Sequence, residues 1–150
     1  MSTFFVDTGA LVKRYIAEIG SPWVLTWIEP TAGNVTVISE LATVEIFSSL
    51  SRRGREGLLS PKDLQVLQSD FLVHVETEYL TVPLDLMVLA QARTLVNKHP
   101  LRALDAVQLA CALRATSVLN EPMSFISGDN NLLKVAAAEG FTTDNPNAYP

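Results

Sequence analysis

Short apolar segments alternate with longer segments of helical periodicity along almost the whole chain, and this alternation constrains the fold most strongly. The apolar segments are predicted strands, at 3–6, 34–38, 79–83, 124–127 and 141–143. The segments between them are predicted helices, at 10–17, 21–29, 39–53, 60–75, 85–98, 101–118 and 131–139. Strands that alternate with helices favour a parallel sheet covered on both faces. We therefore expect an α/β fold of three layers, with a mostly parallel central sheet of four to five strands.

Length and composition favour one compact domain over residues 1–150. The chain is 48% hydrophobic, which argues against disorder, yet no apolar run is long enough to span a membrane. The first residues lack the basic region of a secretory signal. Cys111 is the single cysteine, so an intrachain disulfide is excluded. These features predict a cytoplasmic protein that is not associated with a membrane.

The formal net charge of −5 is the wrong sign for a protein that binds nucleic acid through a broad basic face. It suits a protein that concentrates carboxylates to hold divalent cations. The sequence still allows a local basic patch. The densest basic cluster is Arg52, Arg53 and Arg55, in a predicted loop punctuated by glycine, and Arg14 is a second candidate for a contact with phosphate.

Four acidic residues occupy positions from which they can converge. Asp7 and Asp129 each follow a predicted strand, and open α/β sheets bind their ligands at that edge. Glu45 and Asp105 lie on apolar helical segments, where a carboxylate needs a partner because an isolated buried charge is costly. A divalent cation would satisfy several of these groups together, although Asp7 and Asp129 are also ordinary helix caps. Oxygen ligands alone suit Mg²⁺ or Mn²⁺ rather than zinc.

Four stretches, each containing one of these acids, resemble the motifs of PIN domains: 6–15, 39–45, 101–110 and 125–133, followed by a fitting end at 140–146. The resemblance covers the whole chain and is closest to VapC-type toxins of toxin–antitoxin pairs. It implies a PIN-like three-layer α/β/α domain with the activity of a Mg²⁺- or Mn²⁺-dependent endoribonuclease. It also implies a homodimer that is inhibited by a cognate antitoxin protein.

Carried over by position, the resemblance makes Asp7, Glu45, Asp105 and Asp129 the metal-binding acids. Thr8 and Ser127 become polar supports around the metal or its water. Gly128 departs from the pattern, because many relatives have serine or threonine directly before the fourth acid. This departure puts the reach of Asp129 in doubt.

Two other functions are compatible with such a chain. A structure-specific DNA nuclease would share the acids but normally needs additional DNA-binding elements. A PIN-like module that only binds RNA or protein would not need all four acids. Trp23 and Trp27 lie four residues apart on one predicted helix, and we expect them either in the core or as an anchoring pair for the antitoxin.

Overall fold

The computed structural model describes residues 1–150 and has a five-stranded sheet at its centre. The strands are β1 (Thr3–Val6), β2 (Val35–Ser39), β3 (Tyr79–Val82), β4 (Ser124–Ile126) and β5 (Thr142–Asp144). Their order across the sheet is β3-β2-β1-β4-β5, and every neighbouring pair is parallel. The expected α/β fold with a parallel sheet is thereby confirmed, and each predicted strand agrees with the structure to within one residue at either end.

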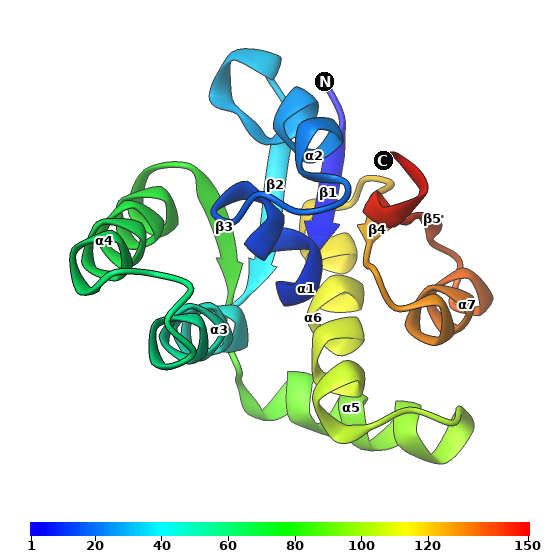
Figure 1. The fold of residues 1–150 in the computed structure, drawn as a ribbon. Coiled ribbons are helices and arrows are strands. Elements are labelled where there is room, and N and C mark those ends of the chain that lie inside the picture. Colours follow the sequence, from blue (N-terminus) through cyan, green and yellow to red (C-terminus); the bar gives the residue numbers. More distant parts are fainter.

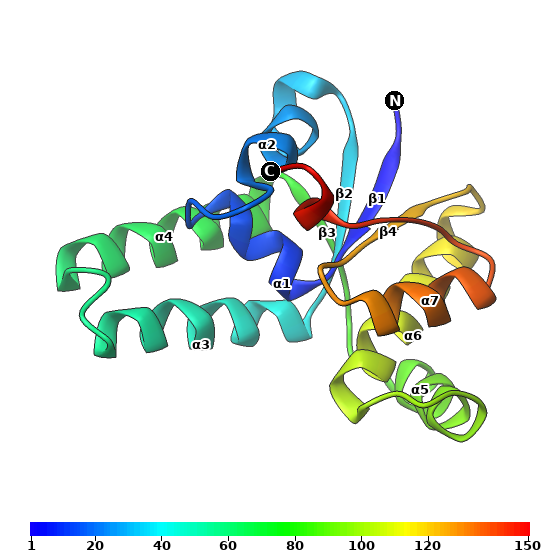
Figure 2. The same ribbon diagram turned by 45° about the vertical axis from the view of Figure 1, so that its right-hand side comes forward.

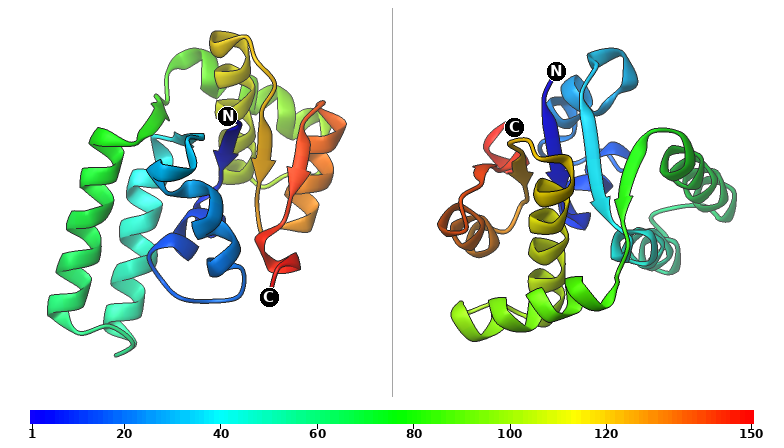
Figure 3. Two further views of the ribbon diagram at one scale, coloured as in Figure 1. Left: turned by 90° about the horizontal axis from the view of Figure 1, so that it is seen from above. Right: turned by 180° about the vertical axis from the view of Figure 1, so that it is seen from behind.

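Helices cover both faces of this sheet (Figures 1 and 3). They are α1 (Thr8–Leu11), α2 (Ser21–Ile28), α3 (Leu41–Arg55), α4 (Pro61–Thr77), α5 (Leu86–Lys98), α6 (Ala103–Leu119) and α7 (Asn130–Ala138). Three 3₁₀ turns complete the chain: η1 (Val12–Arg14), η2 (Pro30–Ala32) and η3 (Pro146–Ala148). None of the helices combines the length and the apolar character that crossing a membrane requires.

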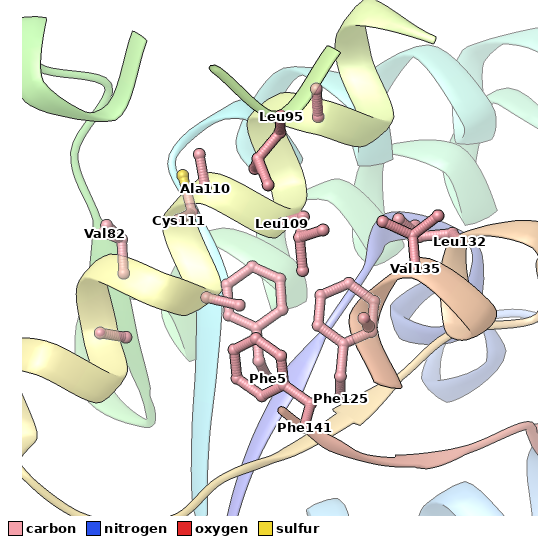
Figure 4. Packing of buried hydrophobic residues seen from close by; sticks show 14 of the residues in the cluster. Phe5, Val82, Leu95, Leu109, Ala110, Cys111, Phe125, Leu132, Val135 and Phe141 are labelled. Carbon is pink, nitrogen blue, oxygen red and sulfur yellow. The ribbon is translucent and has the colours of Figure 1, made fainter. Parts of the chain in front are cut away.

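Two hydrophobic cores lie on opposite faces of the sheet because neighbouring strand residues point in opposite directions. Phe5 of β1 and Phe125 of β4 stack with ring centroids 5.3 Å apart and pack against α5, α6 and α7 (Figure 4). Val6 and Ile126, the next residues along these strands, belong to the core under α1, α2, α3 and α4. The sheet is thus apolar on both faces, as a parallel sheet between two helical layers must be.

Helices α3 and α4 run side by side and project away from the sheet (Figure 2). The predicted loop at Arg52–Arg55 is wrong, because α3 continues through Gly54 to Arg55. A Cβ atom on Gly54 would lie 3.1 Å from Leu64 Cδ2 of α4, so glycine here permits close packing of the two helices. Basic residues in the last turn are also favoured by the helix dipole.

The predicted helix at 10–17 is shorter than expected. The α-helical part ends at Leu11, and the 3₁₀ turn η1 ends at Arg14. The Lys13 ammonium then donates to the carbonyl of Ile19 at 2.6 Å and pairs with Glu18 at 3.1 Å. These contacts close the chain into a compact loop before α2, which periodicity alone does not indicate.

Gly20 is required at the point where the C-terminal segment crosses this loop. Its φ is +87°, and a Cβ atom would lie 2.4 Å from the carbonyl oxygen of Pro146. We expect Gly20→Ala to lower the free energy of unfolding by about 2–4 kcal/mol, because the left-handed backbone and the steric clash add. Gly33→Ala is the control, since Gly33 has a φ of +73° but no atom within 4 Å of such a Cβ. Urea unfolding of both variants measures the difference, and equal losses would contradict a role for the Pro146 contact.

Candidate functional site

The strand order creates a switch point between β1 and β4. From β1 the chain proceeds to β2 on one side, whereas β4 and β5 lie on the other side. Ligands of open α/β sheets bind outside the carboxyl ends of the strands at such a point. Two of the expected site residues, Asp7 and Ser127, directly follow these two strands. The Ser127 hydroxyl donates a hydrogen bond to Asp7 Oδ2, which joins the two strand ends across the switch point.

Asp7 is the most buried of the four acids, with 9% of its surface exposed. Its Oδ1 accepts a hydrogen bond from the Ala10 amide at 3.0 Å and thereby caps α1. Burial raises the pKa of Asp7 to about 6, and the negative charges of Asp105 and Glu45 act in the same direction. The hydrogen bonds from Ser127 and Ala10 act against this rise. The carboxylates of Asp105 and Glu45 therefore lie close enough to Asp7 for their charges to act on it.

Glu45 of α3 is held by two polar side chains from other helices. Thr8 of α1 donates its hydroxyl proton to Glu45 Oε1 at 2.6 Å. Gln108 of α6 donates through Nε2 to the same oxygen at 2.9 Å and to Thr8 Oγ1 at 3.1 Å. The structure therefore brings both Thr8 and Gln108 into contact with Glu45.

Arg102 links the other two acids. Its Nε lies 3.1 Å from Asp105 Oδ2, and its Nη2 lies 3.3 Å from Asp129 Oδ2. The side chain of Arg102 is 81% exposed, so each ion pair is partly screened by solvent. This single guanidinium is the only cation paired with any of the four acids.

Asp129 also has the structural role that its sequence context allowed. Its Oδ1 caps α7 by accepting from the amides of Asn131 at 2.9 Å and Leu132 at 3.2 Å. Its own amide donates to Ser127 Oγ at 3.0 Å, which ties it to the switch point. A Cβ atom on Gly128 would lie 3.0 Å from Asn147 Nδ2, so the glycine there accommodates the C-terminal segment.

The donor chemistry of this cluster fits a divalent cation, although the side chains do not form a ready ligand set. No group of three or more histidine, cysteine, aspartate or glutamate side chains is arranged to hold a metal ion. Oxygens of Glu45, Asp105 and Asp129 are instead engaged by the hydrogen bonds and ion pairs described above. Nevertheless, the ligand atoms available are oxygens, which suit Mg²⁺ or Mn²⁺. A cation would also stabilise the buried charge of Asp7, whose pKa is raised first by burial and then by the charges of Asp105 and Glu45.

The three arginines of α3 that were predicted to contact phosphate have different surroundings in the structure. Arg52 and Arg55 are exposed on the last turns of α3. Arg52 lies seven residues after Glu45, which places it about 10 Å further along the same helix face. Arg53 is held by Ser49 and by Glu18, with Nη2 3.4 Å from Glu18 Oε2.

Arg14 does not join the acidic cluster, and the predicted phosphate contact needs correction. Its side chain is only 5% exposed and pairs with Glu78 at 2.6 Å and with Glu29 at 3.3 Å. The same guanidinium donates to the Tyr79 hydroxyl at 2.8 Å. Burial opposes its charge, but the hydrogen bonds to Glu78 and Tyr79 outweigh burial and raise the pKa of Arg14. The guanidinium therefore joins η1 to β3 and is not accessible to a phosphate group.

The two tryptophans are largely covered by their own chain. Trp27 is 6% exposed and packs on Phe4 with ring centroids 4.6 Å apart. Trp23 is half-buried and stacks on Tyr149 at 4.2 Å. The prediction that both form an anchoring pair for an antitoxin is therefore wrong for Trp27, and the prediction of a core position fits it.

Sequence reasoning assigned no site role to Gln108 or Arg102, although both lie in the segment around Asp105. Gln108 lies three residues after Asp105 on a helix whose neighbouring residues are apolar. A buried polar side chain on such a helix requires a partner, and this requirement was the available signal. Arg102 lies three residues before Asp105, a spacing that allows an ion pair, whereas its second contact, with Asp129, spans 27 residues.

Comparisons with known proteins agree with this architecture. A family model described as a PIN domain matches residues 4–138, whereas no curated protein matches the chain in sequence. Among solved structures, FitAcB from Neisseria gonorrhoeae is similar, with a TM-score of 0.67 and 15% identity over 96% of this chain and 98% of that chain. A toxin–antitoxin complex from Klebsiella pneumoniae gives 0.64 and 12% over 96% and 98%. FitAB bound to an IR36 DNA fragment gives 0.68 and 15% over 96% and 95%. At these identities the likeness concerns the fold.

Proposed function

Because this chain belongs to the PIN domain family, we propose that it is a metal-dependent endoribonuclease and the toxin of a toxin–antitoxin pair. Residues 1–150 would form a single PIN domain. The observation that carries the proposal is the burial of Asp7 beside Asp105 and Glu45 at the switch point of the sheet. Burial of neighbouring carboxylates opposes their ionisation and destabilises the folded protein at neutral pH, and such groups cluster at sites that bind a cation or carry out a reaction.

The metal would be Mg²⁺ or Mn²⁺, held by Asp7, Glu45, Asp105 and Asp129. When bound, a divalent cation supplies an activated water and neutralises charge on the scissile phosphate. The chain itself orients the ligands: Ser127 holds Asp7, and Thr8 holds Glu45. Arg102 provides the one guanidinium that is paired with these acids. Its ion pairs with Asp105 and Asp129 would have to break before the same carboxylate oxygens could bind a metal. The exposed guanidinium would then be free to contact a phosphate.

The decisive experiment is cleavage of cellular RNA by the purified protein without its antitoxin. RNA, single-stranded DNA and double-stranded DNA are incubated with Mn²⁺ or Mg²⁺, and with EDTA. We expect cleavage of RNA that requires the metal and stops in EDTA. Cleavage of DNA in preference to RNA would favour the DNA nuclease. DNA is included as a substrate because the similar FitAB was solved bound to a DNA fragment. Absence of cleavage with every metal and substrate would favour a binding module.

The exposed arginines at the end of α3 are the proposed contact with the RNA backbone. We expect Arg52→Gln to reduce the slope of log affinity against log salt by about one, because one phosphate contact releases about one counterion. Arg93→Gln is the control, since Arg93 is exposed on α5 and forms no ion pair. Filter binding of RNA over a range of salt concentrations measures both slopes, with Ca²⁺ replacing Mg²⁺ to prevent cleavage. Identical slopes would remove α3 from the RNA surface.

We propose an antitoxin protein as the macromolecular partner because one similar structure is described as a toxin–antitoxin complex. A homodimer is the proposed assembly of the toxin itself. The apolar side chains of Leu86 and Met87, adjacent on α5, are 84% and 62% exposed and would be covered in such a dimer. Light scattering of the purified protein at several concentrations tests this assembly.

A further inference from the structure

We propose that Gln108 is a positioning residue that fixes Glu45 for metal binding. The inference rests on the proposed function, in which Glu45 is a metal ligand. It concerns a residue that contacts neither the metal nor the RNA. It follows from the hydrogen bonds, the burial and an unpaired atom of the Gln108 side chain.

The amide nitrogen of Gln108 contacts two oxygens of the site. Nε2 donates to Glu45 Oε1 at 2.9 Å and to Thr8 Oγ1 at 3.1 Å. Because Thr8 accepts this bond, its own proton is directed to Glu45 Oε1 at 2.6 Å. Glu45 Oε1 therefore receives two hydrogen bonds, whereas neither contact uses Oε2. These two hydrogen bonds hold Oε1 of Glu45 and leave Oε2 as the carboxylate oxygen available to a ligand.

The orientation of the amide is set by its neighbours. If the amide were turned over, Oε1 would face the Glu45 carboxylate, and two acceptors would then be opposed. In the orientation present, Oε1 is buried and has no donor within the chain. An unsatisfied buried acceptor is unfavourable, and leucine at this position would avoid it. The unpaired oxygen offsets part of the stability that the two hydrogen bonds of Nε2 provide, so the orientation of Glu45 is the distinctive effect of glutamine at this position.

The hydrogen bonds of Gln108 also connect side chains from three different helices. Gln108 lies on α6, Thr8 begins α1, and Glu45 lies on α3. The side chain is 4% exposed, so the packed core of α6 holds it rigidly. Glutamate has three rotatable side-chain bonds, and its carboxylate would sample several orientations without such a contact. Groups that orient a metal ligand in this way commonly change metal affinity 10- to 100-fold when removed.

The test compares Mn²⁺ affinity, measured by calorimetry without RNA, for the wild type and Gln108→Leu. We expect Gln108→Leu to bind Mn²⁺ 10- to 100-fold more weakly. Its melting temperature in EDTA should stay close to that of the wild type, because removing the unpaired oxygen offsets the loss of the two hydrogen bonds of Nε2. Gln68→Leu is the matched control, since Gln68 of α4 also donates through Nε2, at 3.3 Å to Ser51 Oγ, away from the site. It should leave the affinity unchanged.

Failure of this inference differs from failure of the proposed function. An unchanged Mn²⁺ affinity of Gln108→Leu, with an affinity that still depends on Asp7, would overturn the role of Gln108 alone. Absence of Mn²⁺ binding by the wild type would overturn the proposed metal site and this inference with it. If Gln108→Leu does not fold, Gln108→Met replaces it, because methionine is unbranched like glutamine. The same shift in affinity is then expected.

Discussion

Replacing Asp7 by asparagine should reduce metal-dependent RNA cleavage by about a thousand-fold, or about 4 kcal/mol of transition-state free energy. Asparagine has the same shape, and its amide oxygen can still accept the bond from Ala10 that caps α1. The substitution removes the charge at the centre of the acidic cluster and replaces Oδ2 by an amide nitrogen, so the Ser127 hydroxyl must accept a hydrogen bond where it now donates one. Cleavage assays at saturating Mn²⁺ measure the loss, and activity within tenfold of the wild type would exclude Asp7 as a metal ligand.

The same substitution should stabilise the protein in EDTA at neutral pH. The pKa of Asp7 is raised from 3.8 to about 6. A raised pKa means that the folded state binds the proton more tightly, so its contribution to stability is complete below about pH 4. It is lost as the pH rises through about 6. Asp7→Asn should therefore gain about 2–3 kcal/mol at pH 7.

Urea unfolding from pH 4 to pH 7 measures this difference. The wild type should lose stability relative to Asp7→Asn over that interval. Asp63→Asn is the control, because Asp63 is exposed in the first turn of α4. A pH-independent difference between the wild type and Asp7→Asn would contradict the electrostatic explanation. Saturating Mg²⁺ should narrow the difference at pH 7, since a bound cation stabilises only the wild-type carboxylate.

The second large effect is expected at Arg14, on stability rather than catalysis. Its guanidinium is 5% exposed and pairs with Glu78 and Glu29. Tyr79 is bonded both to this guanidinium and to the Tyr15 hydroxyl, at 2.7 Å. Removing one partner of a buried ion pair leaves the other charge uncompensated, so Arg14→Ala should cost about 3–5 kcal/mol.

Chemical denaturation in EDTA measures the cost at Arg14, and Arg93→Ala provides the control because Arg93 is exposed. The comparison separates the structural explanation from the RNA contact that the sequence suggested. If Arg14→Ala unfolds like the control but weakens RNA binding, Arg14 contacts the substrate after all. A large loss of stability, with any folded fraction still binding RNA normally, supports the buried network.

The order of strands and helices could be predicted from the sequence because it depends on local patterns. Apolar runs such as 3–6 and 124–127 are too short for helices and are followed by capping residues. Three of the candidate acids could be singled out for a related reason. Asp7 and Asp129 occur where strands end, and Asp105 is a charged residue on an apolar helix. Each of these signals lies within about ten residues of sequence.

Contacts between distant segments could not be predicted in this way. Arg14 and its partner Glu78 are 64 residues apart, and nothing near Arg14 in sequence distinguishes it from a surface cation. Gln108 reaches Glu45 across 63 residues. Helix α3 continues through Gly54, where Leu64 of the neighbouring helix packs closely, whereas the local signal at Gly54 favoured a loop.

The hydrogen bond between Ser127 and Asp7 spans 120 residues, and this separation affects how the protein is made. β1 leaves the ribosome first, but its neighbour β4 follows only after β2, β3 and the helices α3 to α6. Sheets that pair such distant strands form late in folding because the long intervening chain must first be ordered. The acidic cluster is therefore incomplete until β4 has been synthesised and has paired with β1. Under the proposed function, a nascent chain would gain its activity only after this late pairing.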